Sequence, residues 1–267
     1  MAKIMKQIST LSGLQAEQYC DPIKAEQLKV DKLNADVGTE KYLDCPKCKN
    51  KGFVYYLDEN NSISSKVCEC YSKRESIKRI KKSGLENLMN EYTFDKYKAV
   101  ENWQKEVKSK ALAFLDDNYK KWFYIGGQVG SGKTFICTAI TGELMTKGKR
   151  AVYMLWRDEV VALKANVNDF PEYDKRMSEL KNAEVLYIDD FFKTEKGKDP
   201  TSADVNVAFE LLNYRYNNHD LITIISSERP VDELMQIDEA VGCRIYQRAK
   251  DYNLSIKPDM SKNMRFR

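Results

Sequence analysis

The sequence contains no long hydrophobic run, and this absence excludes one class of protein at the outset. No apolar stretch in the 267 residues approaches the ~18 residues that a bilayer-spanning helix needs. The first residues also lack an apolar segment of the length found in secretory signals. We therefore expect a cytoplasmic protein with no membrane partner, in which thiols stay reduced. Internal repeats and low-complexity tracts are absent as well.

A large excess of charge of one sign is also missing. The chain has 44 Lys and Arg against 40 Asp and Glu, a formal net charge of +4. Charge alone therefore does not indicate nucleic-acid binding. The hydrophobic content of 42% and charged content of 31% are typical of a globular protein with a core, and the length allows one large domain plus a smaller module.

The most informative motif that is present is a glycine-rich loop after an aromatic and β-branched run at 122–126. The loop and the residues that follow it read Gly127, Gln128, Val129, Gly130, Ser131, Gly132, Lys133, Thr134 and Phe135. This is the P-loop pattern, with a strand before it and a helix after it. Its glycines leave backbone N–H groups free to surround a phosphate, and the helix N-terminus favours the same anion. We expect Lys133 to contact the β- and γ-phosphates of ATP and the Thr134 hydroxyl to bind Mg²⁺.

Two acidic residues end a second apolar run. Residues 184–192 read Glu-Val-Leu-Tyr-Ile-Asp-Asp-Phe-Phe, and ligands bind at the carboxyl ends of the strands in open α/β sheets. We expect Asp189 to hold Mg²⁺ through ordered water and Asp190 to polarise the attacking water. A strand that simply exits into an acidic loop is the alternative, and the P-loop upstream favours the functional interpretation.

From residue 91 onward, apolar runs alternate with helix-like segments. The expected strands are 121–126, 151–156, 185–189, 221–226 and 252–256, and the expected helices are 101–118, 133–147, 157–181, 203–217 and 232–249. This alternation predicts an α/β fold with a five-stranded parallel sheet between helices. Strand 221–226 is expected to lie beside the two site strands. The residues at its end, Ser226 to Glu228, either place a polar side chain near the attacking water or form a plain exit.

Four cysteines precede this region in a pattern that indicates zinc. Cys45-Pro-Lys-Cys48 is followed after nineteen residues by Cys68-Glu-Cys70, and no histidine lies nearby. Four thiolates suit a tetrahedral Zn²⁺ with no open position, so the metal is expected to be structural. The intervening residues predict a hairpin with a polar turn at 59–62, as in a zinc ribbon. Cys20, Cys137 and Cys243 have no such spacing, and we expect them to be buried small residues.

Three domains are expected. Residues 1–40 are polar with loosely helical apolar spacing, which fits either a solvated helical tail or an arm that docks a partner. Residues 41–84 hold the zinc module and a basic helix with Lys73, Arg74, Lys78, Arg79, Lys81 and Lys82, and Ser83-Gly84 interrupts the pattern. Residues 85–267 form the third domain, which carries the nucleotide motifs.

The order of these motifs resembles that of a known family. It comprises the four cysteines, the basic helix, Tyr92-Thr93-Phe94-Asp95, the P-loop, Ile188-Asp189-Asp190, and the segment from Gly242 to Arg248 that reads Gly-Cys-Arg-Ile-Tyr-Gln-Arg. Over about residues 40–267 the chain is similar to DnaC/DnaI-type helicase loaders, which are AAA+ ATPases, and to the phage or Gram-positive prophage versions in particular. The cysteine module is the most discriminating of these features.

The resemblance implies ATP hydrolysis, assembly into a spiral or ring with ATP, and two partners: a hexameric DnaB-type replicative helicase and single-stranded DNA. It implies that Phe94 and its neighbours line the adenine pocket. It places Glu228 at the first sensor, where the family often has Asn, and Arg244 at the arginine finger, with Arg248 as second choice. Only about eleven residues follow residue 256, so the C-terminal lid of other AAA+ proteins is not expected.

Two segments are candidates for contact with single-stranded DNA. Such binding needs cations along the phosphate backbone and aromatic side chains on which bases stack. One is 71–82. The other is 153–181, which offers Tyr153, Trp156, Arg157, Lys164, Tyr173, Lys175 and Arg176; a solvated helix pair is the alternative there, and Tyr153 and Trp156 are expected in the core.

Three other functions are alternatives to that of a helicase loader. The first is a transposition accessory ATPase of the IstB type, and the second is a zinc-ribbon adaptor that uses nucleotide only as an assembly switch. The third, a small-molecule P-loop kinase, lacks support because no segment resembles its substrate pocket or basic lid.

Overall fold

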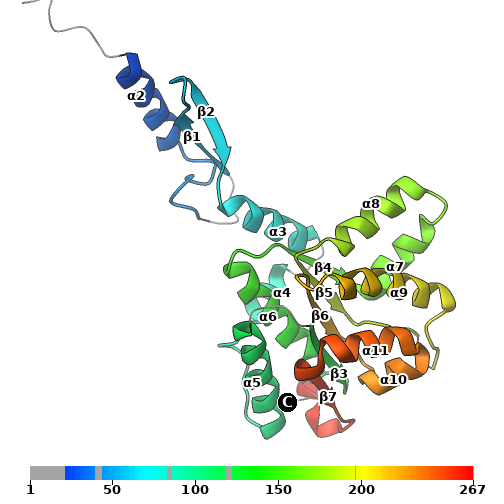
Figure 1. The fold of residues 1–267 in the computed structure, drawn as a ribbon. Coiled ribbons are helices and arrows are strands. Elements are labelled where there is room, and N and C mark those ends of the chain that lie inside the picture. Colours follow the sequence, from blue (N-terminus) through cyan, green and yellow to red (C-terminus); the bar gives the residue numbers. More distant parts are fainter. Residues whose placement is uncertain (1–21, 40–43, 83–85, 118–121, 196, 267) are drawn as a thin grey trace, which may run out of the picture. The chain divides into compact units, whose positions relative to one another are not determined.

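The computed structural model describes residues 22–39, 44–82, 86–117, 122–195 and 197–266 (Figure 1). The chain divides into two compact units, Met1–Tyr71 and Ser72–Arg267, which are described separately. The basic segment forms helix α3 (Cys70–Lys82), so most of it belongs to the larger unit. The expected break at Ser83-Gly84 lies outside the described residues. No helix among the described residues is long and apolar enough to cross a membrane.

The smaller unit is built on a two-stranded hairpin. Strands β1 (Phe53–Leu57) and β2 (Ile63–Val67) pair antiparallel. The Asp58 carboxylate accepts the N–H groups of Asn60 and Ser62, each at 2.9 Å, which is how an aspartate side chain stabilises a tight turn. The hairpin and its polar turn are therefore as predicted. Helix α2 (Pro22–Ala35) joins the hairpin where Asn34 exchanges two hydrogen bonds with the Tyr55 backbone.

A five-stranded sheet in the order β4-β5-β6-β3-β7 forms the centre of the larger unit. Its strands are β3 (Trp122–Gly127), β4 (Ala151–Leu155), β5 (Val185–Asp189), β6 (Ile222–Ser226) and β7 (Asn253–Ile256). Every neighbouring pair is parallel, which confirms the predicted sheet. Because β6 lies between β3 and β5, the P-loop and the aspartate pair leave the same edge of the sheet on either side of β6.

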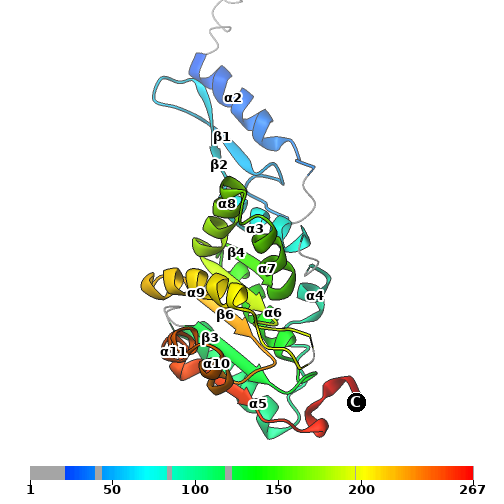
Figure 2. The same ribbon diagram turned by 90° about the vertical axis from the view of Figure 1, so that its right-hand side faces the viewer.

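Helices cover both faces of this sheet (Figures 1 and 2). Alternate residues of each strand point to opposite faces, so Phe123 of β3 packs with one core cluster and Trp122 and Tyr124 with the other. The first cluster contains α4 (Glu86–Glu91), α5 (Asn102–Asp116) and α6 (Lys133–Thr146). The second contains α7 (Trp156–Ala165), α8 (Phe170–Lys181), α9 (Ser202–Asn217), α10 (Val231–Ile237) and α11 (Glu239–Arg248).

Two helices that were predicted as single segments are each divided in two. The expected helix at 157–181 is interrupted between α7 and α8, and Pro171 stands at the start of α8, where its missing N–H costs no hydrogen bond. The expected helix at 232–249 is interrupted at Asp238, which has extended backbone. The Asp238 carboxylate accepts the N–H of Val241 at 2.7 Å and so caps α11. A proline and a capping aspartate therefore override the apolar periodicity.

Candidate nucleotide site and cysteine cluster

The P-loop of the structure begins where β3 ends and closes at the N-terminus of α6. Gly127 and Gly130 have φ angles of 104° and 75°, which disfavour a side chain. A Cβ at Gly127 would lie 2.1 Å from the Ile256 carbonyl oxygen, so the close packing of β7 also requires glycine there. The Gln128 N–H donates to the same Ile256 carbonyl oxygen at 3.0 Å, so β7 holds the start of the loop, and glycines give the rest of the loop the backbone freedom that a phosphate-binding turn requires.

Lys133 is folded over this loop. Its Nζ donates to the carbonyl oxygens of Gly127 at 2.8 Å and Gln128 at 2.7 Å, and the residue is only 6% exposed. Burial lowers the pKa of Lys133, against the opposing effect of the acids Glu228 and Asp190. A phosphate group over the loop would offset that burial penalty with negative charge, so the position fits the predicted phosphate contact.

Thr134 and Asp189 meet as the sequence predicted for a Mg²⁺ site. The Thr134 hydroxyl donates to Asp189 Oδ1 at 3.1 Å, and Asp189 is 5% exposed at the end of β5. A hydroxyl and a carboxylate are oxygen ligands of the kind that Mg²⁺ takes, usually with several waters. The two side chains therefore fit this ion.

Three further hydroxyl groups donate to Asp189. The sequence marked only Ser226, at the end of the expected strand 221–226, as a possible polar neighbour of the site, and it missed the two tyrosines. Tyr187 donates to Oδ1 at 2.8 Å, Ser226 also donates to Oδ1, and Tyr153 donates to Oδ2 at 3.1 Å. Burial raises the pKa of both tyrosines, so they remain proton donors. The alternation of β4 and β5 would have predicted only that these side chains share a face of the sheet. The hydroxyls orient the carboxylate in a buried setting.

Asp190 stands next to Asp189 but points into a different environment. Its φ of 54° lies in the left-handed region, which is strained for a residue with a side chain and is found more often at functional sites. Lys193 donates to Asp190 at 2.7 Å and lies 3.0 Å from Glu228. Burial favours the neutral amine of Lys193, but the two ion pairs outweigh it and raise the pKa. Asp190 and Glu228 are therefore brought together, by a lysine that was not singled out from the sequence.

A cavity of about 230 Å³ opens over the loop and is lined by Lys133, Thr134, Asp190, Lys193 and Glu228. Its aromatic wall is Phe135 with Tyr92, whose rings stack with centroids 4.5 Å apart. Phe94, expected near the adenine, is instead buried in the core, and its neighbour Tyr92 reaches the cavity. A larger cavity of about 690 Å³ is lined by the acids Glu75, Asp158, Glu159 and Glu179 together with Lys78 and Arg176. Both of these cations already pair with acids of the lining, and the sequence marked none of these acids as part of a nucleotide site.

The two candidate arginines on α11 have different surroundings. Arg248 is 7% exposed, lies over the Trp122 ring, and donates to the carbonyl oxygens of Tyr216 and His219. Arg244 is half-buried, with its guanidinium 4.8 Å from the centroid of the Phe209 ring and a hydrogen bond to Asn213. Arg248 is thus held inside its own subunit, whereas Arg244 lies at the surface near the exposed Tyr246.

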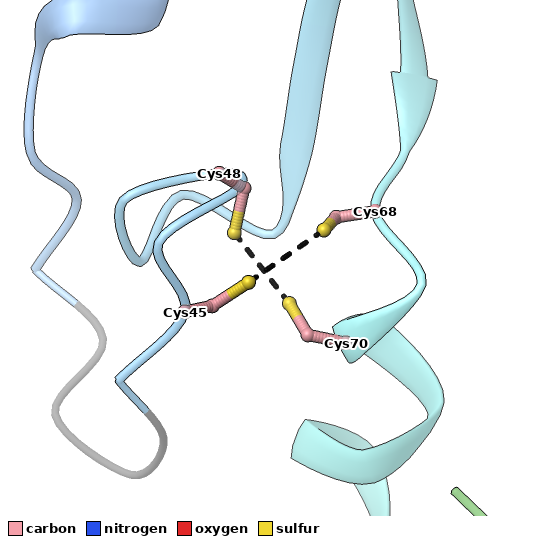
Figure 3. Close-up of side chains that lie close together, drawn as sticks. All are labelled: Cys45, Cys48, Cys68 and Cys70. Atoms are coloured by element: carbon pink, nitrogen blue, oxygen red, sulfur yellow. Dashed lines mark hydrogen bonds between the residues drawn. The ribbon is translucent and has the colours of Figure 1, made fainter.

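The four predicted zinc ligands converge in the smaller unit (Figure 3). Their Sγ atoms all lie within 4.8 Å of one another, with Cys48 and Cys70 at 3.5 Å and Cys45 and Cys68 at 3.9 Å. Zn–S bonds of about 2.3 Å in a tetrahedron place sulfur atoms about 3.8 Å apart. The donor set and its spacing therefore fit Zn²⁺, which would crosslink the loop before β1 to the start of α3.

The cluster also favours negative charge on some of its thiols. Burial opposes ionisation of Cys48, but the Gly52 N–H and the neighbouring thiols outweigh it and lower its pKa to about 6. Burial raises the pKa of the neighbouring Cys68 thiol. Of the other cysteines, Cys137 is buried as predicted, whereas the same prediction for Cys243 is wrong because it is exposed on α11. Cys20 lies outside the described residues.

Several cations of the two expected DNA-binding segments form ion pairs with acids of the same unit. In 153–181, Arg176 contacts both Glu159 and Glu179, Lys164 contacts Asp204, and Lys175 contacts Glu172. Tyr153 and Trp156 are core residues, as expected. In α3, Arg74 is 2% exposed and Lys78 lies 3.4 Å from Glu75. Arg157 is exposed, and the side chains of Arg79, Lys81 and Lys82 lie outside the described residues.

Comparison with known proteins agrees with this site. The model of the IstB-like ATP binding protein family matches residues 64–248. The phage-like element PBSX protein XkdC of Bacillus subtilis is 32% identical over 225 residues, covering 80% of this chain and 82% of that protein. The replicative helicase loader DnaC of Escherichia coli is 26% identical over 49% of this chain and 56% of its own length.

A solved structure shows the same fold. The crystal structure of the DnaC helicase loader superposes with a TM-score of 0.53 and 18% identity, covering 65% of this chain and 99% of that one. The predicted α/β fold with its five-stranded parallel sheet and the resemblance to DnaC-type and phage-type proteins are confirmed. Because the family model covers more than half of its length, this chain belongs to the IstB-like ATP-binding protein family.

Proposed function

We propose that this protein is an ATPase that loads a hexameric DnaB-type replicative helicase onto single-stranded DNA in the cytoplasm. One observation carries the proposal: the same chain holds a nucleotide site, in which Thr134 donates a hydrogen bond to Asp189, and a four-cysteine module ahead of it in sequence. The relative named as a helicase loader supports it. The arm that docks the helicase is assigned to residues 1–40, of which α2 is described.

Each residue of the site has a role in this proposal. The loop N–H groups and Lys133 bind the β- and γ-phosphates of ATP. Thr134 and Asp189 hold Mg²⁺, which neutralises the charge that develops on the phosphates. Asp190 orients and polarises the attacking water, and Glu228 lies beside it through Lys193. Arg244 of a neighbouring subunit completes the site in a ring or spiral, because it is the arginine of α11 at the surface.

A second function has its own support. The matched family model begins at residue 64, so Cys45 and Cys48 lie outside the region shared with IstB-like proteins, while Cys68 and Cys70 lie inside it. A transposition accessory ATPase would use the same core without needing that module. The loader function predicts that the smaller unit is essential for recruiting the partner, whereas the accessory function does not. An adaptor that only binds ATP as a switch would keep nucleotide binding and show no turnover.

Co-purification with a DnaB-type helicase, with and without ATP, tests the proposal. The tagged chain should retain the helicase, and retention should change with ATP. Lys133→Ala should weaken ATP binding by roughly 100-fold, because it removes charge-assisted hydrogen bonds to phosphate, and should abolish the ATP dependence. Failure to retain the helicase in either nucleotide state, alongside capture of a transposase, would favour the IstB-type function.

A further inference from the structure

The segment after β7 returns to the P-loop and is bonded to it. Asp259 N donates to Gln128 Oε1 at 2.8 Å, and Met264 N donates to the Gly130 carbonyl oxygen at 2.8 Å. Two short 3₁₀ turns, η2 (Met260–Lys262) and η3 (Met264–Phe266), shape this path. Residues 259–266, called the return segment here, are therefore attached to the loop that is expected to bind phosphate.

Packing between the return segment and the loop is close. Asn263 is 9% exposed, and a Cβ at Gly130 would lie 2.1 Å from Asn263 Oδ1. The same oxygen accepts the N–H of Arg265 at 3.0 Å. Gly130 is thus required for this packing as well as for its positive φ, and Asn263 fixes the backbone of Arg265 against the loop.

Through this packing, Arg265 lies at the nucleotide cavity. Arg265 is one of the residues that line the cavity, together with Lys133 and Lys193. Lys193 is already paired with Asp190 and Glu228, and Lys133 bonds to loop carbonyls. Within the part of the chain that the structure describes, the Arg265 guanidinium has no acidic partner. It is also exposed, so it is free to meet an incoming anion.

We propose that Arg265 binds a phosphate of the nucleotide in the same subunit, held in place by Asn263 and Met264. The planar guanidinium presents paired N–H donors that match phosphate oxygens, and a triphosphate carries more negative charge than Lys133 alone neutralises. The inference rests on the proposed ATP site and adds a second cation to it, from a segment about 130 residues away in sequence from Lys133. Arg244 acts between subunits, whereas Arg265 acts within one.

Nucleotide titration of the full chain tests this proposal. The wild type, Arg265→Ala and Arg265→Lys are titrated with fluorescent ATP and ADP in the presence of Mg²⁺. Arg265→Ala should weaken binding of at least one of the two by about ten-fold or more, the usual effect of losing a charge-assisted hydrogen bond. Arg265→Lys should recover part of the affinity, because lysine restores the positive charge but not the paired N–H donors of the guanidinium.

Lys262→Ala is the matched control, because Lys262 lies in the same segment but is not a lining residue of the cavity. It should bind both nucleotides like the wild type. Wild-type affinity of Arg265→Ala for ATP and ADP would overturn the inference and leave the ATP site intact. Equal losses in Arg265→Ala and Lys262→Ala would also overturn it, since they would show only a general effect of charge. Absence of nucleotide binding by the wild type would instead overturn the proposed function, and this inference with it.

Discussion

At the level of single residues, the two adjacent aspartates have different surroundings, which suit the different roles proposed for them. Asp189 is buried and accepts four hydroxyl hydrogen bonds, so it is fixed in orientation and suits a metal. Asp190 has a left-handed backbone and pairs with Lys193, so it lies at the cavity and can reach water. The left-handed backbone of Asp190 thus directs two neighbouring carboxylates into different surroundings.

Asp190→Asn tests the water-polarising role. The variant should bind ATP normally and hydrolyse it about 100-fold more slowly or worse, since general-base groups contribute ~10²–10⁴-fold. Binding and steady-state hydrolysis are measured separately. Glu228→Gln is the control for the shared ion pair with Lys193 and should have the smaller effect. Hydrolysis by Asp190→Asn at the wild-type rate would move the catalytic role to another residue.

Arg248→Ala and Arg244→Ala should differ in stability. Arg248 is buried against Trp122 and bonds to two carbonyl oxygens, so its loss should lower the free energy of unfolding by about 2–4 kcal/mol. Arg244 is half-buried at the surface, and its loss should cost less than ~1 kcal/mol. Urea unfolding of both variants provides the comparison. Equal stability of the two would mean that Arg248 does not anchor α11.

At the level of elements, the hairpin and the sheet are stabilised by different means. The sheet carries two apolar clusters on its faces, which is enough to hold a domain together. The β1–β2 hairpin has five residues in each strand and largely exposed or half-buried side chains, and an isolated two-stranded hairpin is marginal in water. The cysteine cluster next to it is therefore expected to contribute most of the stability of that unit.

Removal of metal should therefore affect the two units unequally. A chelator should unfold residues 45–70, because a structural zinc site contributes folding free energy directly, while the ATPase core stays folded. Metal analysis should give one Zn²⁺ per chain, and limited proteolysis should cut only the cysteine region after chelation. Cys45→Ser should behave like the chelated protein, and Cys243→Ser, at an exposed cysteine outside the cluster, should behave like the wild type. Simultaneous loss of both units would contradict this independence.

At the level of the whole molecule, the nucleotide site is incomplete in one subunit if Arg244 acts on a neighbour. The guanidinium lies among Phe209, Tyr216 and Asn213 on one side of the larger unit, on helices that pack against the second core cluster. The P-loop helix α6 packs in the first cluster. An assembly in which one subunit's α11 meets the next subunit's cavity would use both surfaces, and ATP would then control assembly.

Mixing two inactive variants tests the shared site. Arg244→Ala alone and Lys133→Ala alone should each lack hydrolysis. A mixture should regain part of the activity, because Lys133→Ala subunits supply Arg244 to sites that still bind ATP. Titration of one variant into a fixed amount of the other gives the measurement. Activity of Arg244→Ala alone at the wild-type rate, or no recovery in the mixture, would argue against a shared site.

The sequence by itself determined the local motifs: the phosphate loop, the aspartate pair, the cysteine quartet, the hairpin and the parallel sheet. Each of these is encoded in spacing and periodicity over a few residues. Helix boundaries were less well predicted, since Pro171 and Asp238 divide helices whose apolar pattern runs on.

Only the tertiary structure decided which distant side chains complete the site. The side chains that it adds come from separate segments of the chain. Tyr153 and Ser226 donate to Asp189, and Lys193 pairs with Glu228. Tyr92, rather than Phe94, lines the cavity, as does Arg265. Strand order and chain return bring them together, and no short-range pattern records such contacts. The burial of Arg248 and the exposure of Cys243 were decided in the same way, by which face of α11 packs on the core.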